Sequence, residues 1–214
     1  MFTEKELGHL LLAVIILTFI VSFKKILGNQ IDYLFFLISF IFLALITLIN
    51  VIAKKAAANY FESNLEIKIW EWQRFGFRRE QQFKKPIPMG IIAPFIISFL
   101  TLGSFFLFTP LESNVEGTTA RASKRHGKYR FTELTDMHMG IIISSGVIAN
   151  LILAIIAYLI NLGELAKWNI YFAAFSLIPF GNLDGMKIFM GKKEIWFTLA
   201  IITMIFLSYA LFLP

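Results

Sequence analysis

The acidic residue Asp184 stands at the end of an apolar stretch, in the sequence SLIPFGNLDGMKIF. Pro179 and Gly181 interrupt this stretch just before the acid, and Gly185 follows it. A carboxylate beside a long apolar run is costly unless a cation, a metal ion or water receives it. Asp184 is therefore a candidate for ion pairing or for metal ligation, and its partner has to come from elsewhere in the chain.

Other metal ligands are few, because the chain has three histidines and no cysteine. His9 ends the sequence KELGH, and His138 lies two residues after Asp136. A metal site of His9, His138 and Asp184 is one interpretation. In the other interpretation His9 belongs to a polar helix start, and Thr135 or Asp136 caps a helix. Without cysteine the chain can form neither a disulfide framework nor a thiolate site.

The elements that would position these residues are long apolar segments. Of the 214 residues, 57% are hydrophobic, and several runs have the length that a helix needs to cross about 30 Å of hydrocarbon. We predict one all-α, multi-pass membrane domain over residues 1–214. Its predicted helices cover residues 7–23, 33–55, 139–161, 168–183 and 195–213.

A sixth run, residues 87–109, is interrupted by Pro94 and Gly103 and either crosses the membrane or re-enters it. If it crosses, the Lys and Arg residues divide evenly between the two sides. If it enters and returns on one side, nearly all of them fall on that side. The second arrangement fits the excess of basic residues in cytoplasmic loops. We therefore predict five crossings and one re-entrant segment, with the N-terminus and the basic loops in the cytoplasm.

The loops contain one strand signal. Leu65, Ile67 and Ile69 alternate with Glu66 and Lys68, a period of two that predicts a half-buried strand in a short β-hairpin region at the cytoplasmic face. Residues 111–135 are rich in Ser, Thr, Gly and basic residues, and we predict a mobile basic loop. The net charge of +6 comes with no nucleic-acid-binding motif, so we expect no nucleic-acid partner.

Two stretches resemble the site-2 protease family of intramembrane zinc metalloproteases. The stretch FSLIPFGNLDG resembles the family motif N-x-x-P-x-x-x-L-D-G, with Pro179 and Asp184 at its proline and aspartate. The stretch SSGVIANLILAI resembles the G-P-x-x-N helix of the family, with Gly146 and Asn150 at its glycine and asparagine. The resemblance implies that Asp184 holds the position of the third zinc ligand. The other two ligands and the general base of the family come from an H-E-x-x-H motif.

The chain departs from the family at this motif. The sequence INVIAKKAAANYF places Asn50 and Lys54 at the two histidine positions and Val51 at the glutamate. Asparagine is a poor zinc ligand, valine cannot accept a proton, and an ammonium group repels a divalent cation. We therefore expect no metal cofactor. Instead, Lys54 should pair with Asp184, and Asn50 should add an amide hydrogen bond.

These residues predict a catalytically inactive member of the family that binds or regulates membrane clients. Its expected partners are the lipid bilayer and a transmembrane or extended client segment. The alternative is an active intramembrane zinc metalloprotease whose zinc ligands have moved to His9, His138 and Asp184.

Overall fold

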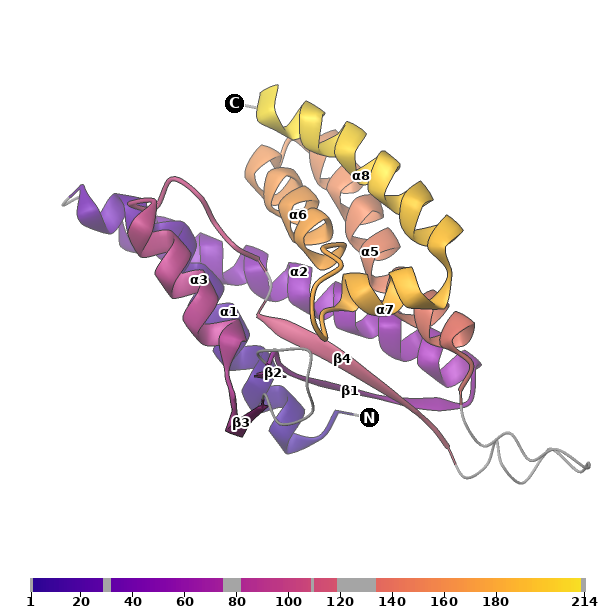
Figure 1. The fold of residues 1–214 in the computed structure, drawn as a ribbon. Coiled ribbons are helices and arrows are strands. Elements are labelled where there is room, and N and C mark those ends of the chain that lie inside the picture. Colours follow the sequence, from indigo (N-terminus) through magenta and orange to yellow (C-terminus); the bar gives the residue numbers. More distant parts are fainter. Residues whose placement is uncertain (1, 29–31, 75–81, 109, 119–133, 213–214) are drawn as a thin grey trace, which may run out of the picture.

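The computed structural model describes residues 2–28, 32–74, 82–108, 110–118 and 134–212, and this part of the chain is mostly helical (Figure 1). Four of its helices are long and apolar enough to cross a membrane. They are α1 (Glu4–Leu27), α2 (Tyr33–Tyr60), α5 (Asp136–Leu159) and α8 (Lys193–Phe212). The sequence prediction of long apolar helices is confirmed for these four, although α2 continues five residues beyond the predicted end at residue 55.

Polar side chains set where three of these helices begin. The Thr3 hydroxyl accepts a hydrogen bond from the backbone N–H of Glu6, whose carboxylate accepts from the backbone N–H of Thr3, which is a complete capping box. The Asp32 carboxylate caps α2 by accepting hydrogen bonds from the backbone N–H groups of Leu34 and Phe35. Thr135 caps α5 through the N–H of His138, so the cap predicted at this helix is confirmed.

The helix predicted over residues 168–183 is wrong at both ends. Helix α6 runs from Gly163 to Ser176 and is followed by a connection and then by a short helix, α7 (Asp184–Gly191). Proline has no backbone N–H and Gly181 adopts a positive φ of 55°, so Pro179 and Gly181 favour a turn here. Asp184 consequently begins a new helix.

The segment predicted over residues 87–109 forms α3 (Met89–Leu100), which contains Pro94, and residues 101–108 then follow in irregular backbone, while residue 109 lies outside the described residues. Its two ends meet at one residue. The Gly90 N–H donates to the Trp70 carbonyl at 2.8 Å, and the Trp70 N–H donates to the Pro110 carbonyl at 2.9 Å. A side chain at Gly90 would collide with the Pro110 carbonyl oxygen, so glycine permits this close approach. The segment therefore leaves the strands and comes back to them (Figure 1).

The alternating pattern at residues 65–69 is confirmed as strand β1 (Ser63–Ile69), which buries every second residue. Its partner is β4 (Leu111–Gly117), antiparallel, with Ile67 opposite Ser113. The first part of the predicted loop 111–135 is thus a strand, because pairing with β1 supplies backbone hydrogen bonds; residues 119–133 lie outside the described residues. A second antiparallel pair joins β2 (Trp72–Arg74) and β3 (Gln82–Ile87).

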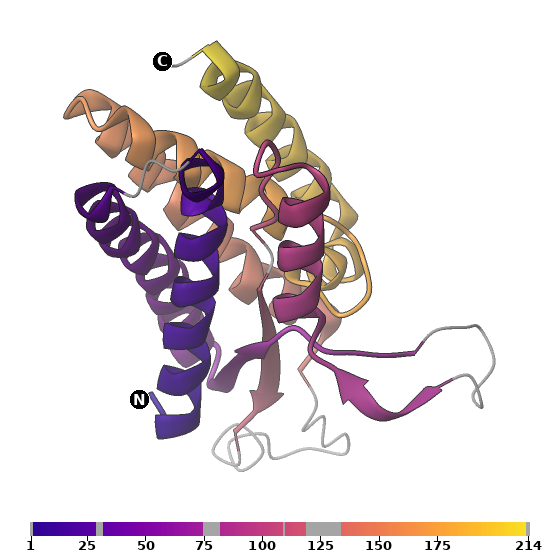
Figure 2. The same cartoon turned by 90° about the vertical axis from the view of Figure 1, so that its left-hand side faces the viewer.

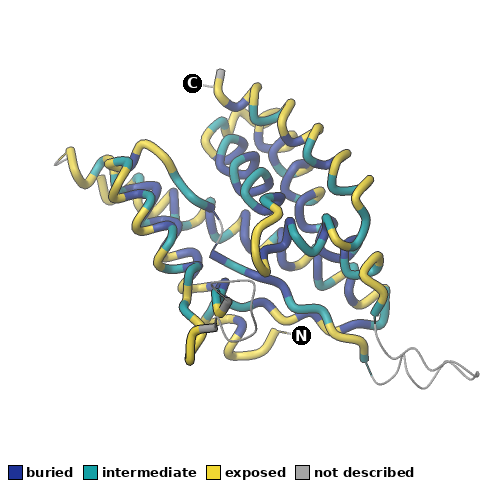
Figure 3. The backbone as a smooth tube through the Cα atoms, in the orientation of Figure 1, coloured by how far each residue is buried: buried dark blue, intermediate teal, exposed yellow. Residues whose placement is uncertain are grey.

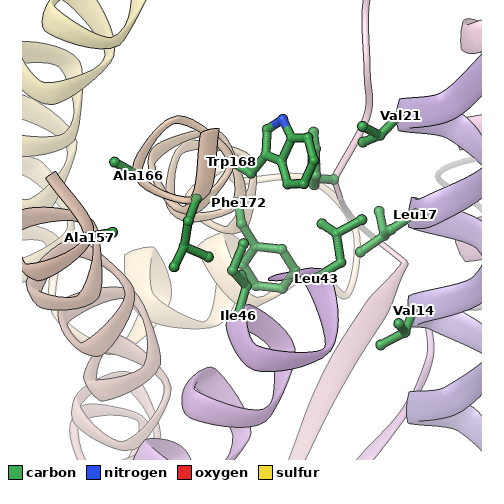
Figure 4. Close-up of a cluster of buried hydrophobic side chains, with 11 residues drawn as sticks. Val14, Leu17, Val21, Leu43, Ile46, Ala157, Ala166, Trp168 and Phe172 are labelled. Carbon is green, nitrogen blue, oxygen red and sulfur yellow. The ribbon is translucent and has the colours of Figure 1, made fainter. Parts of the chain in front are cut away.

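The helices pack around an apolar core, and the strands lie at one end of it. Figure 4 shows side chains of α1 and α2 meeting Trp168 and Phe172 of α6 in the largest buried cluster. Figure 2 shows the N-terminus and the strands at one end of the helices and the C-terminus at the other. The outward side of α8 is mostly exposed, although its side chains are apolar (Figure 3).

Candidate functional site

A buried ion pair joins α2 to the start of α7. The Lys54 Nζ lies 2.5 Å from Asp184 Oδ2, and the two side chains are only 4% and 7% exposed. The side chain of Lys54 reaches across from the penultimate turns of α2, and the turn at residues 177–183 brings the carboxylate to meet it. The pairing predicted from the sequence is confirmed. Lys54 is the counter-ion of the acidic residue at the end of the apolar stretch.

Ser113 of β4 completes the hydrogen bonding of this pair. Its hydroxyl accepts from Lys54 Nζ at 3.2 Å, and its backbone N–H donates to Asp184 Oδ1 at 3.1 Å. A buried charge pair is tolerable only when its remaining donors and acceptors are satisfied, and Ser113 supplies two of these contacts. The sequence analysis assigned this supporting role to Asn50, and that assignment is wrong. Within the described residues, Asn50 Nδ2 is buried without a hydrogen-bond partner.

A small cavity adjoins the pair. It measures about 20 Å³, enough for about one water molecule. Asn50, Val51, Lys54 and Asp184 all border it, together with Ser176. The four positions that the family resemblance assigns to the general base and the three zinc ligands therefore surround a single space, although they come from two elements far apart in the sequence.

Gly146 of α5 makes room for the α2 side chains. A Cβ atom at this position would lie 2.5 Å from Lys54 Cε and 2.8 Å from Asn50 Nδ2. Asn150, one turn later, is fully buried, and neither its Oδ1 nor its Nδ2 has a partner among the described residues. Pro179 does not join this group, since it lies exposed in the connection between α6 and α7.

A second ion pair lies beside the first on α2. Lys55 Nζ lies 2.8 Å from Glu6 Oε2, and the Glu6 side chain is 2% exposed. The other oxygen, Glu6 Oε1, accepts from the backbone N–H of Ile67 in β1 at 3.1 Å. The sequence analysis missed Lys55 and Ser113. The Thr3-x-x-Glu6 spacing of a capping box was a signal for Glu6, but only the tertiary structure identifies its partner.

The carboxylates of Glu6 and Asp184 bind the two outer edges of the β1–β4 sheet at one pair of opposite residues. The outward N–H groups of Ile67 and Ser113, which face each other in the register, donate to Glu6 and Asp184. Lys187 Nζ donates to the Ser113 carbonyl at 2.6 Å. Burial lowers the pKa of Lys187, and the charges of Asp184 and Glu112 offset this only in part. Side chains thus occupy the groups through which a further strand would pair.

The histidines lie away from this site. His9 is partly exposed on α1, and His138 at the start of α5 contacts Thr135 and the ring of Phe61. Across the ranges that the structure describes, no three or more His, Cys, Asp or Glu side chains gather closely enough to hold a metal ion. His9, His138 and Asp184 are accordingly not brought together.

The charges at this site are balanced within the site itself. Lys54 and Asp184 neutralise each other, and Val51 offers no group that accepts a proton at the cavity. Comparison of the chain with protein-family models, with curated proteins and with solved structures finds no significant match.

Proposed function

We propose that this chain is an integral membrane protein with a site-2-protease-like core that has no protease activity and that binds or regulates membrane clients. The observation that carries the proposal is the common cavity of Asn50, Val51, Lys54 and Asp184. The resemblance predicts that these four positions surround one point in space. Residues 50, 51 and 54 of α2 and residue 184 of α7 lie far apart in the sequence, and their meeting at one cavity supports the proposal.

The exposed surface supports a membrane location. Large apolar side chains are exposed along α8, where Phe197, Ile201, Met204 and Ile205 are each more than half exposed. An apolar surface of this kind is unfavourable in water and favourable against lipid tails. Helices α1, α2, α5 and α8 supply four crossings, and we assign the fifth to α6 with the connection that follows it.

In the proposed topology the N-terminus, the strands and the basic loops are cytoplasmic. The meeting of both ends of segment 87–109 at Trp70 supports re-entry of this segment. The one-sided distribution of Lys and Arg that re-entry produces supports the cytoplasmic orientation. The buried pair then lies near the cytoplasmic ends of α2 and α6.

The proposed lack of activity follows from what replaces the metal site. Lys54 places a positive charge beside Asp184, so the carboxylate has its counter-ion without a metal. A zinc protease also needs a base for the attacking water, and Val51 is apolar. In this proposal the membrane helices around the site hold a client without cutting it.

Restoring the metal site tests the proposal. We expect the triple variant Asn50→His, Val51→Glu, Lys54→His to bind about one zinc ion per chain, because histidines at i and i+4 would face Asp184 across the cavity. The matched control adds Asp184→Asn and should lose the zinc. If the triple variant folds poorly, the double variant Asn50→His, Lys54→His keeps the apolar Val51 and tests the same ligands.

Metal analysis and X-ray absorption of the purified variants give the readout. Zinc bound with two histidine ligands in the variant, and lost with Asp184→Asn, supports the proposal. A folded double or triple variant that binds no zinc would overturn it, because the positions would then lack the geometry that the resemblance requires.

A further inference from the structure

A cleft of about 850 Å³ lies between the start of α1, the end of α2 and the β1–β4 sheet. It is separate from the small cavity beside Asp184 and shares none of its lining residues. Figure 2 shows the elements that border it, with the N-terminus beside the strands at one end of the helices. In the proposed topology this end is cytoplasmic.

The cleft carries unbalanced negative charge. Glu66 faces Asn114 and Glu116 faces Asn64 across the strand pair, and alternate residues of a strand point to one face. Both glutamates border the cleft and are exposed. No ion-pair partner for either is found in the described part of the chain. The remaining two charges of the lining, Glu6 and Lys55, neutralise each other.

Apolar side chains border the same cleft. Phe2 comes from the chain before α1 and Ile52 from α2, and Ile52 is about half exposed. A surface that combines apolar side chains with two carboxylates suits long basic side chains, because the methylene stem can lie on the apolar part while the charged end meets the acid.

The sheet edges limit how a partner can bind here. Glu6 occupies the outward N–H of Ile67, and Asp184 and Lys187 occupy the outward groups of Ser113. A partner cannot add as a strand at this level without displacing buried charges. Contacts to the exposed face through Glu66 and Glu116 require no such displacement.

We propose that this cleft binds the basic cytoplasmic flank of a membrane client. The inference rests on the proposed function, which supplies the membrane client and the cytoplasmic side. Segments next to transmembrane helices on that side are rich in Lys and Arg. The Lys and Arg side chains of such a flank would pair with the carboxylates of Glu66 and Glu116. The transmembrane helix of the client would then lie in the bilayer beside the exposed part of α2.

Two synthetic peptides serve as probes. They share one leucine- and alanine-rich membrane span, and they carry either four lysines or four glutamates on the flank. The wild-type protein is placed in nanodiscs of uncharged lipid, so that lipid headgroups do not select the peptide. We expect the lysine peptide to bind about tenfold more tightly than the glutamate peptide. In the variant Asn59→Cys, whose changed residue borders the cleft, the new thiol should cross-link to the flank of the lysine peptide.

Charge variants locate the site. Glu66→Gln with Glu116→Gln should remove most of the preference for lysine, and Glu66→Lys with Glu116→Lys should reverse it. The matched control is Glu164→Gln with Glu194→Gln, which removes two exposed carboxylates outside the cleft and should leave the preference unchanged.

Equal binding of the two peptides, or a Glu66/Glu116 variant that behaves like the control, would overturn the inference. The zinc experiment tests different residues, so a failure of the proposed function can be distinguished from a failure of the proposal for the cleft. If the variant binds zinc but the protein does not distinguish the peptides, the proposal for the cleft is rejected and the proposed family resemblance is kept. If Glu66 and Glu116 distinguish the peptides but the variant binds no zinc, the proposal for the cleft is kept and the family resemblance is rejected.

Discussion

Lys54 and Lys55 are neighbours on α2, yet they hold carboxylates at opposite edges of the same sheet. Successive residues on a helix point about 100° apart, so Lys54 reaches Asp184 beside β4 while Lys55 reaches Glu6 beside β1. Each carboxylate also accepts the outward N–H of its strand. The position of the sheet is thereby coupled to the rotation of α2 about its axis, and the pairs join α1, α2 and α7 to the strands.

The buried pair should show strong coupling in a double-mutant cycle. Lys54→Met and Asp184→Asn each leave one buried group without its counter-charge, and each should destabilise the protein by about 3–5 kcal/mol. The double variant should lose clearly less than the sum, as measured by unfolding in detergent. Lys25→Met, the same exchange at an exposed pair, should cost about 1 kcal/mol or less. Additive losses at Lys54 and Asp184 would contradict the coupling.

Gly146 should tolerate no added methyl group. Gly146→Ala places a Cβ within 3 Å of Lys54 and Asn50, and such overpacking typically costs about 1–3 kcal/mol. The matched control is Gly8→Ala in α1, where no atom beyond the adjoining residues and the nearby backbone of the same helix lies within 4 Å of the new Cβ. There alanine should be neutral or should stabilise by up to about 1 kcal/mol through helix propensity. Equal melting temperatures for the two variants would show that α2 and α5 do not approach closely at Gly146.

Lys187 should make stability depend on pH in the alkaline range. Its folded pKa is lowered from the usual 10.5 by burial, so the unfolded chain binds more protons between the two values. The unfolding free energy of the wild type should therefore rise with pH between the folded pKa and 10.5. Below the folded pKa it should be reduced by the full cost of burying the charged amine. Lys187→Met removes this titration. A parallel pH profile for the variant and the wild type would contradict the burial of the amine.

The sequence predicted those features that short-range patterns encode. Apolar length alone identifies α1, α2, α5 and α8, and the period of two identifies β1. Strand β4 was missed because its sequence, LESNVEG, is polar and contains residues typical of turns. It becomes a strand by pairing with β1, which lies more than 40 residues earlier in the chain.

The candidate site was predicted in part for a similar reason. The family spacing indicated that residues 54 and 184 meet, and a lysine facing an aspartate then follows from charge. Asn50 was given a hydrogen bond that Ser113 makes instead, because no sequence pattern reveals which backbone N–H a strand presents. The same limit applies to Glu6, whose contact with Ile67 depends on how α1 packs against the sheet.

Cysteine labelling should show that segment 87–109 returns to the side from which it leaves. The chain contains no cysteine, so single reporters can be placed without background. Lys85→Cys before α3 and Glu116→Cys in β4 should both react with a membrane-impermeant reagent from the cytoplasmic side. Glu164→Cys, at the start of α6, should react only from the other side. Because Gly90 and Pro110 both bind the backbone of Trp70, a crossing would require these hydrogen bonds to break. Labelling of Lys85→Cys and Glu116→Cys from opposite sides would therefore exclude both the re-entrant segment and the cytoplasmic placement of Asp184.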